Sequence, residues 1–349
     1  MADAVNHRLL LRSRPVDRVS LDNFTVDQAE VPGPGPGEAI IKTLYLSLDP
    51  TNRVWMAGDS YLPAVAEGEV MRGLGLGQVV ASNDEKFPVG DLCIGAPGWQ
   101  EYASTGEAQM PWSIVPRGTG LPPTTMLGAL GMTGMTAYWG VTDVCRVKEG
   151  ETFVVDGAAG AVGSVAGQVA KALGARVVGI AGTAEKCEWL VSELGFDAGV
   201  CYRDDDWREQ LKAACPDGVD AQFENVGGEI MDGVFDLLNV HGRVAVCGLI
   251  SDYNENRPAN GPTNFGKVIF ARLTVQGFLI LDYGGRTMEA LGVMVPWMQE
   301  GKLKHEETLV SGGVTKAPET LNMLFDGENR GKLILQVGES DLEVPEVPS

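Results

Sequence analysis

Apolar residues recur every three or four positions in the segment that follows Gly160. This spacing places them on one side of a helix, so the pattern predicts an amphipathic helix that packs on a sheet. Gly174 ends the pattern, in the usual position for a glycine that terminates a helix. The apolar stripe consists of Val162, Val165, Ala166, Val169 and Leu173.

The helix belongs to a longer alternation of strand-like and helix-like segments that starts near Thr152 and runs through "GRVAVCGLI". Repeated alternation of this kind predicts a parallel sheet with helices on both faces. Residues 1–128 have a different pattern, in which short runs rich in β-formers are separated by turns, and they predict an all-β unit. Those runs include residues 38–48, 75–82 and 91–104, after the turn-like "PGPGPGE" at 32–38.

Length and charge narrow the possible classes of protein. A chain of 349 residues suggests two domains. The formal net charge is −20, from 27 Lys+Arg and 47 Asp+Glu, and such a field disfavours nucleic acid and anionic membranes as partners. We find no apolar run of about 20 residues and no signal-type start, and therefore expect a cytoplasmic protein. The acidic tail, residues 339–349, is expected to be disordered.

The cysteines and histidines show no spacing that is typical of a metal site. There is no C-x-x-C pair, and no histidine lies at ligand spacing from a cysteine or another histidine. We therefore expect neither a disulfide framework nor a zinc site, catalytic or structural. The residues are Cys93, Cys145, Cys187, Cys201, Cys215, Cys247, His7, His241 and His305.

Three glycines punctuate the turn between the strand "TFVVD" and the helix. Gly157, Gly160 and Gly163 give G-A-A-G-A-V-G, which departs from G-x-G-x-x-G because Ala158 stands where the strict pattern would start. Small residues let the backbone approach a pyrophosphate, and the N–H groups of a helix start attract its charge. The alternative is a glycine-rich turn that serves packing alone.

The end of the next strand carries no acid. An NAD-binding chain usually has a carboxylate there for the ribose hydroxyls, whereas this chain has Ala181, Gly182 and Thr183, followed by Lys186. A carboxylate would repel a 2′-phosphate, which Thr183 and Lys186 could bind. The pattern therefore predicts NADP(H) as cofactor, unless Lys186 is an ordinary solvated lysine of the helix.

Several motifs in order resemble one family. They are "AAGAVGSVAGQVAKALGARVVG", "FENVGGE", "GRVAVCGLISDYN" and "GENRGKLILQVG", with "SLDPTNRVWM" and "GEVMRGLGLGQVVAS" nearer the start. Over nearly its whole length the chain is similar to the leukotriene hydroxydehydrogenase/prostaglandin reductase branch of the medium-chain dehydrogenase/reductases. Bacterial curcumin reductases and plant alkenal double-bond reductases belong to the same branch.

The resemblance implies an α/β protein that combines a GroES-like β-rich catalytic domain with a Rossmann domain, a doubly wound parallel sheet. The catalytic domain would be split into residues 1–128 and 299–349, around the NADP-binding domain at 129–298. It further implies metal-independent reduction, by NADPH, of the carbon–carbon double bond of α,β-unsaturated ketones and aldehydes, in a homodimer.

The resemblance also assigns roles to individual residues. The pyrophosphate would lie on Gly160, Ala161, Val162 and Gly163, and the 2′-phosphate on Lys186 and Tyr202. The nicotinamide side would contact Asn225, Cys247, Gly248, Ile250, Ser251, Tyr253, Phe278, Leu279 and Ile280, and Asn329 would reach the cofactor from the returning segment. The family's "DPYMR" reads "DPTNR" at 49–53. Thr51 and Asn52 therefore replace residues that often face the substrate.

Hydride delivery to an enone leaves negative charge on the carbonyl oxygen, which needs a hydrogen-bond donor. Tyr253 is the first candidate, because it follows a parallel strand at the edge where ligands bind in such sheets. Tyr61 is the second and Tyr283 a possible lining residue, with Asn52 as a further substrate contact. Surface or packing roles remain the alternatives for these tyrosines. We expect Asp49 to be a turn residue or a structural hydrogen-bond acceptor.

Other functions fit the same features. A quinone oxidoreductase of the same superfamily would share the fold and the cofactor, and an NADPH-binding protein without turnover would share the cofactor loop. A zinc alcohol dehydrogenase fits least, because the metal ligands are missing from the sequence.

Overall fold

The computed structural model describes residues 4–107, 110–254, 261–340 and 342, and its chain divides into two compact units. The first unit consists of residues 1–127 and 307–349, and the second of residues 128–306. Most of the tail at 339–349 lies outside the described residues. As domain boundaries, 1–128 with 299–349 and 129–298 stay a prediction.

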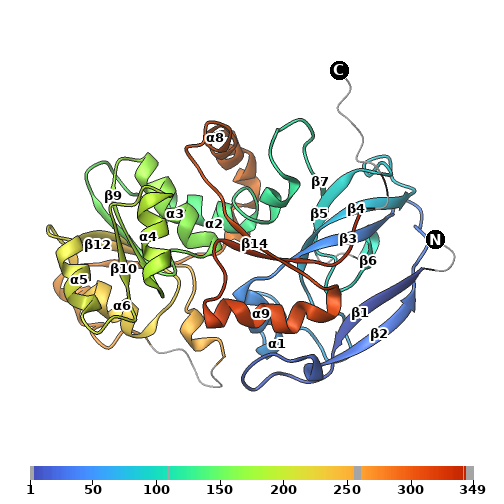
Figure 1. The fold of residues 1–349 in the computed structure, drawn as a ribbon, viewed down its shortest axis with the longest axis horizontal. Coiled ribbons are helices and arrows are strands. Elements are labelled where there is room, and N and C mark those ends of the chain that lie inside the picture. The colour runs from blue at the N-terminus through green and yellow to red at the C-terminus, as the bar shows by residue number, and fades with distance from the viewer. Residues whose placement is uncertain (1–3, 108–109, 255–260, 341, 343–349) are drawn as a thin grey trace. The chain divides into compact units, whose positions relative to one another are not determined.

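The second unit is built on a six-stranded parallel sheet in the order β10-β9-β8-β11-β12-β13 (Figure 1). Because β8 lies between β9 and β11, the order reverses between β8 and β11, which is the Rossmann arrangement predicted from the sequence. The strands are β8 (Thr152–Val155), β9 (Arg176–Ala181), β10 (Ala198–Cys201), β11 (Val219–Glu224), β12 (Leu238–Val246) and β13 (Thr274–Gly277).

Alternate residues of these strands pack on different helices. Val154 and Val178 join one buried cluster with Leu211 and Val234, which come from two helices that follow β10 and β11. The next residue, Gly179, packs closely on the helix that follows β9, and a Cβ there would lie 2.7 Å from the Leu190 side chain. The helices are α2 (Met132–Trp139), α3 (Ala161–Ala172), α4 (Ala184–Ser192), α5 (Trp207–Ala214), α6 (Gly228–Phe235), α7 (Lys267–Phe270) and α8 (Thr287–Gln299).

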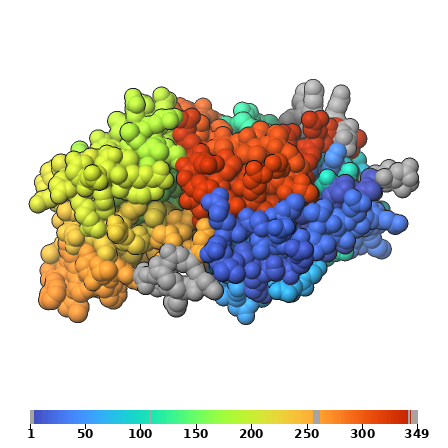
Figure 2. Space-filling view, turned by 60° about the horizontal axis from the view of Figure 1, so that its bottom comes forward, coloured from blue at the N-terminus to red at the C-terminus, as the bar shows by residue number. Residues whose placement is uncertain are grey.

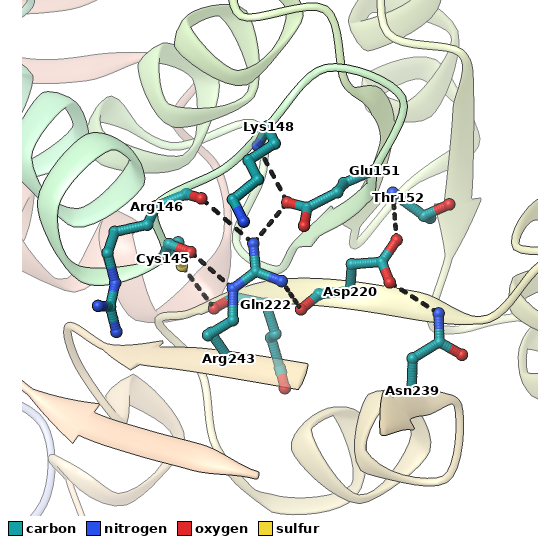
Figure 3. A network of polar contacts seen from close by, with 9 residues as sticks. All are labelled: Cys145, Arg146, Lys148, Glu151, Thr152, Asp220, Gln222, Asn239 and Arg243. Atoms are coloured by element: carbon teal, nitrogen blue, oxygen red, sulfur yellow. Dashed lines mark hydrogen bonds and ion pairs between the residues drawn. The ribbon is translucent and has the colours of Figure 1, made fainter. Parts of the chain in front are cut away.

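A polar network joins the segments that lead into the sheet (Figure 3). The Arg243 guanidinium donates to the carbonyl oxygens of Cys145 at 2.9 Å and Asp220 at 3.0 Å, and to the Glu151 carboxylate at 2.5 Å. It also reaches the carbonyl of Arg146, which has a left-handed φ of 49°. Two carbonyls of the connection between α2 and β8, those of Cys145 and Arg146, therefore accept from a single side chain.

The first unit contains a seven-stranded sheet and a two-stranded hairpin. The larger sheet runs β14-β15-β3-β4-β5-β7, and β6 also pairs with β3. The strands are β1 (Val5–Leu11), β2 (Phe24–Glu30), β3 (Ala39–Ser47), β4 (Leu74–Ser82), β5 (Leu92–Gly95), β6 (Tyr102–Ser104), β7 (Ser113–Ile114), β14 (Glu307–Ser311) and β15 (Lys332–Gln336). The β-rich runs predicted at 38–48, 75–82 and 91–104 contain β3, β4, and β5 with β6.

The end of the chain completes this unit. Strand β15 pairs antiparallel with β3, and α9 (Ala317–Asp326) packs beside α1 (Pro50–Ala57). Arg18 forms an ion pair with Asp326, and Asn322 bonds to both the N–H and the carbonyl of Val19. Figure 2 shows the orange-red surface of the α9 region directly beside the blue N-terminal surface. No helix within the described residues is long and apolar enough to cross a membrane.

Candidate functional site

The glycine-rich turn after β8 is shaped by two backbone requirements. Gly157 has φ of +55°, a conformation that favours glycine. At Gly163 a Cβ would lie 2.5 Å from the carbonyl oxygen of Gly157, so any side chain there would push α3 away from the turn. Alanine is accommodated at position 158 because the facing residue is Gly179, which has no side chain. A Cβ at Gly179 would lie 3.0 Å from the Ala158 methyl group.

Helix α3 begins directly after this glycine-rich turn, and no side chain caps its first turn. Gly160 is the N-cap residue with extended backbone, and no side chain accepts from the helix start. The N–H groups of Ala161, Val162 and Gly163 have no intrahelical acceptor in an α-helix. The geometry is that of a backbone anion site, which suits a pyrophosphate.

Residues at the ends of β9 and β10 gather beside the start of α4. Thr183 caps α4, and its hydroxyl accepts from the Lys186 N–H at 3.2 Å. The Tyr202 ring lies over Gly182, where a Cβ would come within 3.2 Å of the ring. Because β9 and β10 are parallel neighbours, Lys186 and Tyr202 lie on adjacent connections.

Arg203 adds a second cationic side chain to this region. It was not identified from the sequence. Its guanidinium carbon lies 5.8 Å from the centre of the Tyr202 ring. In the sequence, three aspartates directly follow Arg203 and mask its positive charge. In the structure, Asp204 and Asp206 instead accept hydrogen bonds from Gln210. The position of Arg203 directly after a strand end was the signal that could have identified it.

The connections after β11 and β12 are tied to each other by backbone hydrogen bonds. Ile250 N–H donates to the carbonyl of Asn225, and Ser251 N–H donates to that of Val226, both at 3.0 Å. Cys247 and Gly248 N–H groups donate to the Glu224 carbonyl. The structure therefore brings together Asn225, Cys247, Gly248, Ile250 and Ser251, all predicted for the nicotinamide side.

Tyr253 folds back on its own loop. Its hydroxyl accepts a hydrogen bond from Leu249 N–H at 3.2 Å, and the same oxygen lies 3.0 Å from where a Cβ of Gly248 would be. The phenol is thus held among the residues predicted to bind the cofactor. Cys247 beside it is no nucleophile at neutral pH, because burial raises the pKa of its thiol to about 12.

Phe278 and Tyr283 belong to two different aromatic contacts after β13. The Phe278 ring meets the Phe223 ring edge-on at 6.0 Å, next to the exposed Leu279 and the half-buried Ile280. Tyr283 instead stacks on Trp139 at 5.3 Å, and its hydroxyl donates to Asp143 at 3.0 Å. Its role as a substrate contact stays a prediction.

In the first unit, Asp49 and Asn52 hold the start of α1. Asn52 is 1% exposed, and its side-chain oxygen accepts from the Asp49 N–H at 2.9 Å. Lys332 donates to the Asp49 carboxylate at 2.8 Å, and Ser47 donates to it at 2.5 Å. Asp49 is therefore a structural acceptor, as expected, and Asn52 is a capping residue.

Tyr61 and Asn329 are the other predicted residues of this unit. Tyr61 is 41% exposed and shares a hydrogen bond with Thr51, and its ring lies edge-on to Trp55 at 6.4 Å. Burial of the phenol raises its pKa, which keeps it a protonated donor at neutral pH. Asn329 is buried and donates to the carbonyl of Gly331 at 2.9 Å.

Comparisons with known proteins match both units. A family model described as the N-terminal domain of oxidoreductase matches residues 7–112, and one described as zinc-binding dehydrogenase matches residues 161–298. The chain is 41% identical to the NADPH-dependent curcumin reductase of Escherichia coli (strain K12), over 96% of this chain and 98% of that protein. It belongs to the medium-chain dehydrogenase/reductases, in their zinc-independent reductase branch.

This medium-chain dehydrogenase/reductase has further relatives of the same length. It is 39% identical to the NADP(+)-dependent 2-alkenal reductase of Nicotiana tabacum, over 91% of this chain and 92% of that protein. The crystal structure of CurA in complex with NADPH, from Vibrio vulnificus, has 40% sequence identity and a TM-score of 0.90. That comparison covers 96% of this chain and 100% of the CurA chain.

The name of the second family model raises the question of zinc. Across the described ranges of this medium-chain dehydrogenase/reductase, no three His, Cys, Asp or Glu side chains are grouped so that they could hold a metal ion. Five of its six cysteines are buried, and burial raises the pKa of the Cys93 and Cys145 thiols to about 12. Thiols of this kind do not readily become metal-binding thiolates.

Proposed function

We propose that the protein is an NADPH-dependent reductase that reduces the carbon–carbon double bond of α,β-unsaturated ketones and aldehydes. The observation that carries the proposal is the similarity, over more than 90% of the chain, to relatives named curcumin reductase and 2-alkenal reductase. The substrate class is therefore a conjugated carbonyl compound, and the two domains at 1–128 with 299–349 and at 129–298 are its catalytic and NADP-binding parts.

The residues present fit the cofactor. The space over Gly163 would be closed by a Cβ, and the uncapped start of α3 suits a pyrophosphate. The end of β9, where a chain selective for NAD would carry a carboxylate, has none, and the nearby Lys186, Tyr202 and Arg203 would hold the 2′-phosphate. Asn225, the loop 247–253 and residues 278–280 would hold the nicotinamide half, and the family resemblance adds Asn329 as a further cofactor contact.

NADPH, when bound, supplies the hydride for the β-carbon of the substrate. The chain contributes the positions of the reactants and a hydrogen bond to the carbonyl oxygen, on which negative charge develops. Tyr253 is the first candidate donor, because its hydroxyl already lies in the loop predicted to bind the cofactor. Tyr61 is the second, because its hydroxyl is a donor at neutral pH and is oriented by Thr51.

The experiment is NADPH oxidation with a panel that contains a linear enone, an alkenal, an aryl enone and a benzoquinone. We expect turnover of the enones and alkenal, and NMR of the product should show a saturated carbon–carbon bond with the carbonyl retained. Turnover of the benzoquinone alone would favour a quinone oxidoreductase, and tight NADPH binding without turnover would favour a binding protein. Activity that a chelator abolishes and zinc restores would contradict the metal-free mechanism.

A homodimer and a cytoplasmic location complete the proposal. The strand β13 is at the edge of its sheet, and the neighbouring Phe265, Ile269 and Phe270 are exposed by 56%, 75% and 79%. Apolar side chains beside a strand edge support pairing with a second copy of the chain. Light scattering after size-exclusion chromatography tests the dimer, and fractionation of cells tests the location.

A further inference from the structure

Two fully buried carboxyl groups lie side by side where the strand order of the Rossmann sheet reverses. Asp156 directly follows β8, and Glu224 is the last residue of β11, its parallel neighbour. This is the point at which open α/β sheets bind their ligands. Neither side chain has a part in the chemistry derived above.

In the part of the chain that the structure describes, the pair has no cationic partner: no ion pair joins either carboxyl to a lysine, arginine or histidine. The partner that they share is Gln222, whose amide nitrogen lies 2.6 Å from Glu224 and 3.3 Å from Asp156. The Gln222 amide oxygen is buried without a hydrogen bond, so only the donor end of this side chain serves the carboxyls. Two full negative charges in such a place would be strongly unfavourable.

A proton between the carboxyls relieves this conflict. Both carboxyls contact the same Gln222 amide nitrogen, which places them next to each other. Burial raises the pKa of Asp156 to about 6, and burial together with the charge of Asp156 raises the pKa of Glu224 well above its ordinary value. The titratable group that faces the pair from β12 is the Cys247 thiol, which stays neutral because its own pKa is raised.

We propose that Asp156 and Glu224 share one proton and act together as positioning residues for the loops that bind the cofactor. Their outer oxygens accept from three successive backbone N–H groups. Asn225 N–H lies 2.6 Å from Asp156, and the N–H groups of Val226 and Gly227 lie 2.7 and 2.6 Å from Glu224. The remaining negative charge of the pair is thereby held by the turn itself.

Hydrogen bonds connect the turn at residues 225–227 to the loop 247–253. The Asn225 side chain donates to the Asp156 carbonyl at 2.8 Å, and the carbonyls of Asn225 and Val226 accept from Ile250 and Ser251. When the shared proton leaves, repulsion between the carboxylates will displace this turn and with it the loop 247–253. This inference rests on the proposed function only in taking these loops as the cofactor site.

The first experiment measures the melting temperature of the cofactor-free protein from pH 6 to pH 10. Because the folded-state pKa of Glu224 is raised, the stability that its protonated form contributes is lost as the pH rises through that pKa. Glu224→Gln keeps a neutral side chain of the same shape. We expect it to melt higher than the wild type, by a margin that grows as the pH rises and levels off above the folded-state pKa.

The second experiment measures the dissociation constant of NADPH by its fluorescence over the same pH range. Above the pKa of the pair, we expect the ratio of the wild-type constant to that of Glu224→Gln to rise by about tenfold per pH unit. Comparing the ratio removes the pH effects that both proteins share. Asp220→Asn on the same strand is the matched control, and its ratio should stay constant.

Each outcome decides the inference. Parallel melting and binding profiles for wild type and Glu224→Gln would overturn it, and so would a Glu224→Gln protein that fails to fold at pH 6. Asp156→Asn must also remove the additional pH dependence of melting, since one neutral partner is enough to end the repulsion. A wild-type protein that binds no NADPH at any pH would instead defeat the proposed function, while the melting profiles still test the shared proton.

Discussion

Thr51 and Tyr61 are joined by a hydrogen bond of 2.5 Å between their hydroxyl oxygens. Thr51 lies in the first turn of α1, and Tyr61 lies in the segment that follows this helix. The threonine that replaces a family tyrosine is therefore a partner of the candidate donor. Thr51 restricts the orientation of a phenol that is otherwise 41% exposed.

Thr51→Val should raise the pKa of Tyr61 further. Burial is the largest effect and raises that pKa, whereas the hydrogen bond with Thr51 lowers it, so loss of this bond removes one of the opposing effects. Absorbance titration near 295 nm, as the difference from Tyr61→Phe, measures this single ionisation. Thr51→Ser is the control and should titrate as the wild type does. A lowered or unchanged pKa in Thr51→Val would disprove the coupling.

Lys186→Ala should weaken NADPH binding by about 1.5–3 kcal/mol, the range of a charged hydrogen bond, which is about 10- to 100-fold in the dissociation constant. Binding of NADH should barely change, because NADH has no 2′-phosphate. Lys171→Ala removes a lysine that pairs with Asp197 at 2.9 Å and is the control. Equal losses for both cofactors would refute the assignment of Lys186.

Gly163→Ala should lower stability and cofactor affinity together. The new methyl group would lie 2.5 Å from the Gly157 carbonyl oxygen, and overpacking of this kind costs about 1–3 kcal/mol. Gly292→Ala in α8 is the matched control, because no atom lies within 4 Å of its Cβ position. Thermal melting should show Gly292→Ala to be more stable than the wild type, by about 0.5–1 kcal/mol. A Gly163→Ala protein that binds NADPH normally would disprove the close approach.

Tyr253→Phe should lower the turnover number for enones and leave the affinity for NADPH nearly unchanged. The substitution removes a donor to the carbonyl oxygen and keeps the ring over Gly248. Steady-state kinetics with NADPH binding measured in parallel test this, and Tyr102→Phe on β6 is the control. Unchanged turnover would remove Tyr253 from the mechanism.

Lys332→Met should destabilise the first unit by about 3–5 kcal/mol, because it leaves the buried Asp49 carboxylate without its cation. The Lys332 side chain is 2% exposed and that of Asp49 is 9% exposed. Lys316→Met, which breaks an exposed pair with Glu319, should cost no more than about 1 kcal/mol. The shift of the melting temperature measures both. Similar shifts for the two variants would contradict the structural role of the buried pair.

The sequence was sufficient for features that are local in the chain. The apolar stripe from Val162 to Leu173 predicted α3, and the glycines before it predicted the turn that the structure shows after β8. The Rossmann order of the sheet followed from the alternation of strands and helices together with the family resemblance. These features depend on periodicity and on backbone conformation, which neighbouring residues determine.

Contacts between distant segments could not be predicted in this way. Asp156 and Glu224 meet only because β8 and β11 become neighbours, and no spacing in the sequence indicates that pairing. Lys332 reaches Asp49 across 283 positions of the chain. Arg203 was not identified for a different reason, since a common surface residue type acquires a role only through the tyrosine beside it. Thr51 was noted as a departure from the family motif, but its hydrogen bond to Tyr61 was not predicted.

The pairing of β15 with β3 has a consequence for how the chain folds during synthesis. Residues 128–306 are continuous and can fold on the ribosome as soon as they emerge. The sheet that contains β3 stays incomplete until residue 336 has been translated, so Leu46 and Leu48 lack their neighbour Leu335 until then. The N-terminal segment, although made first, is thus the last to reach its native state.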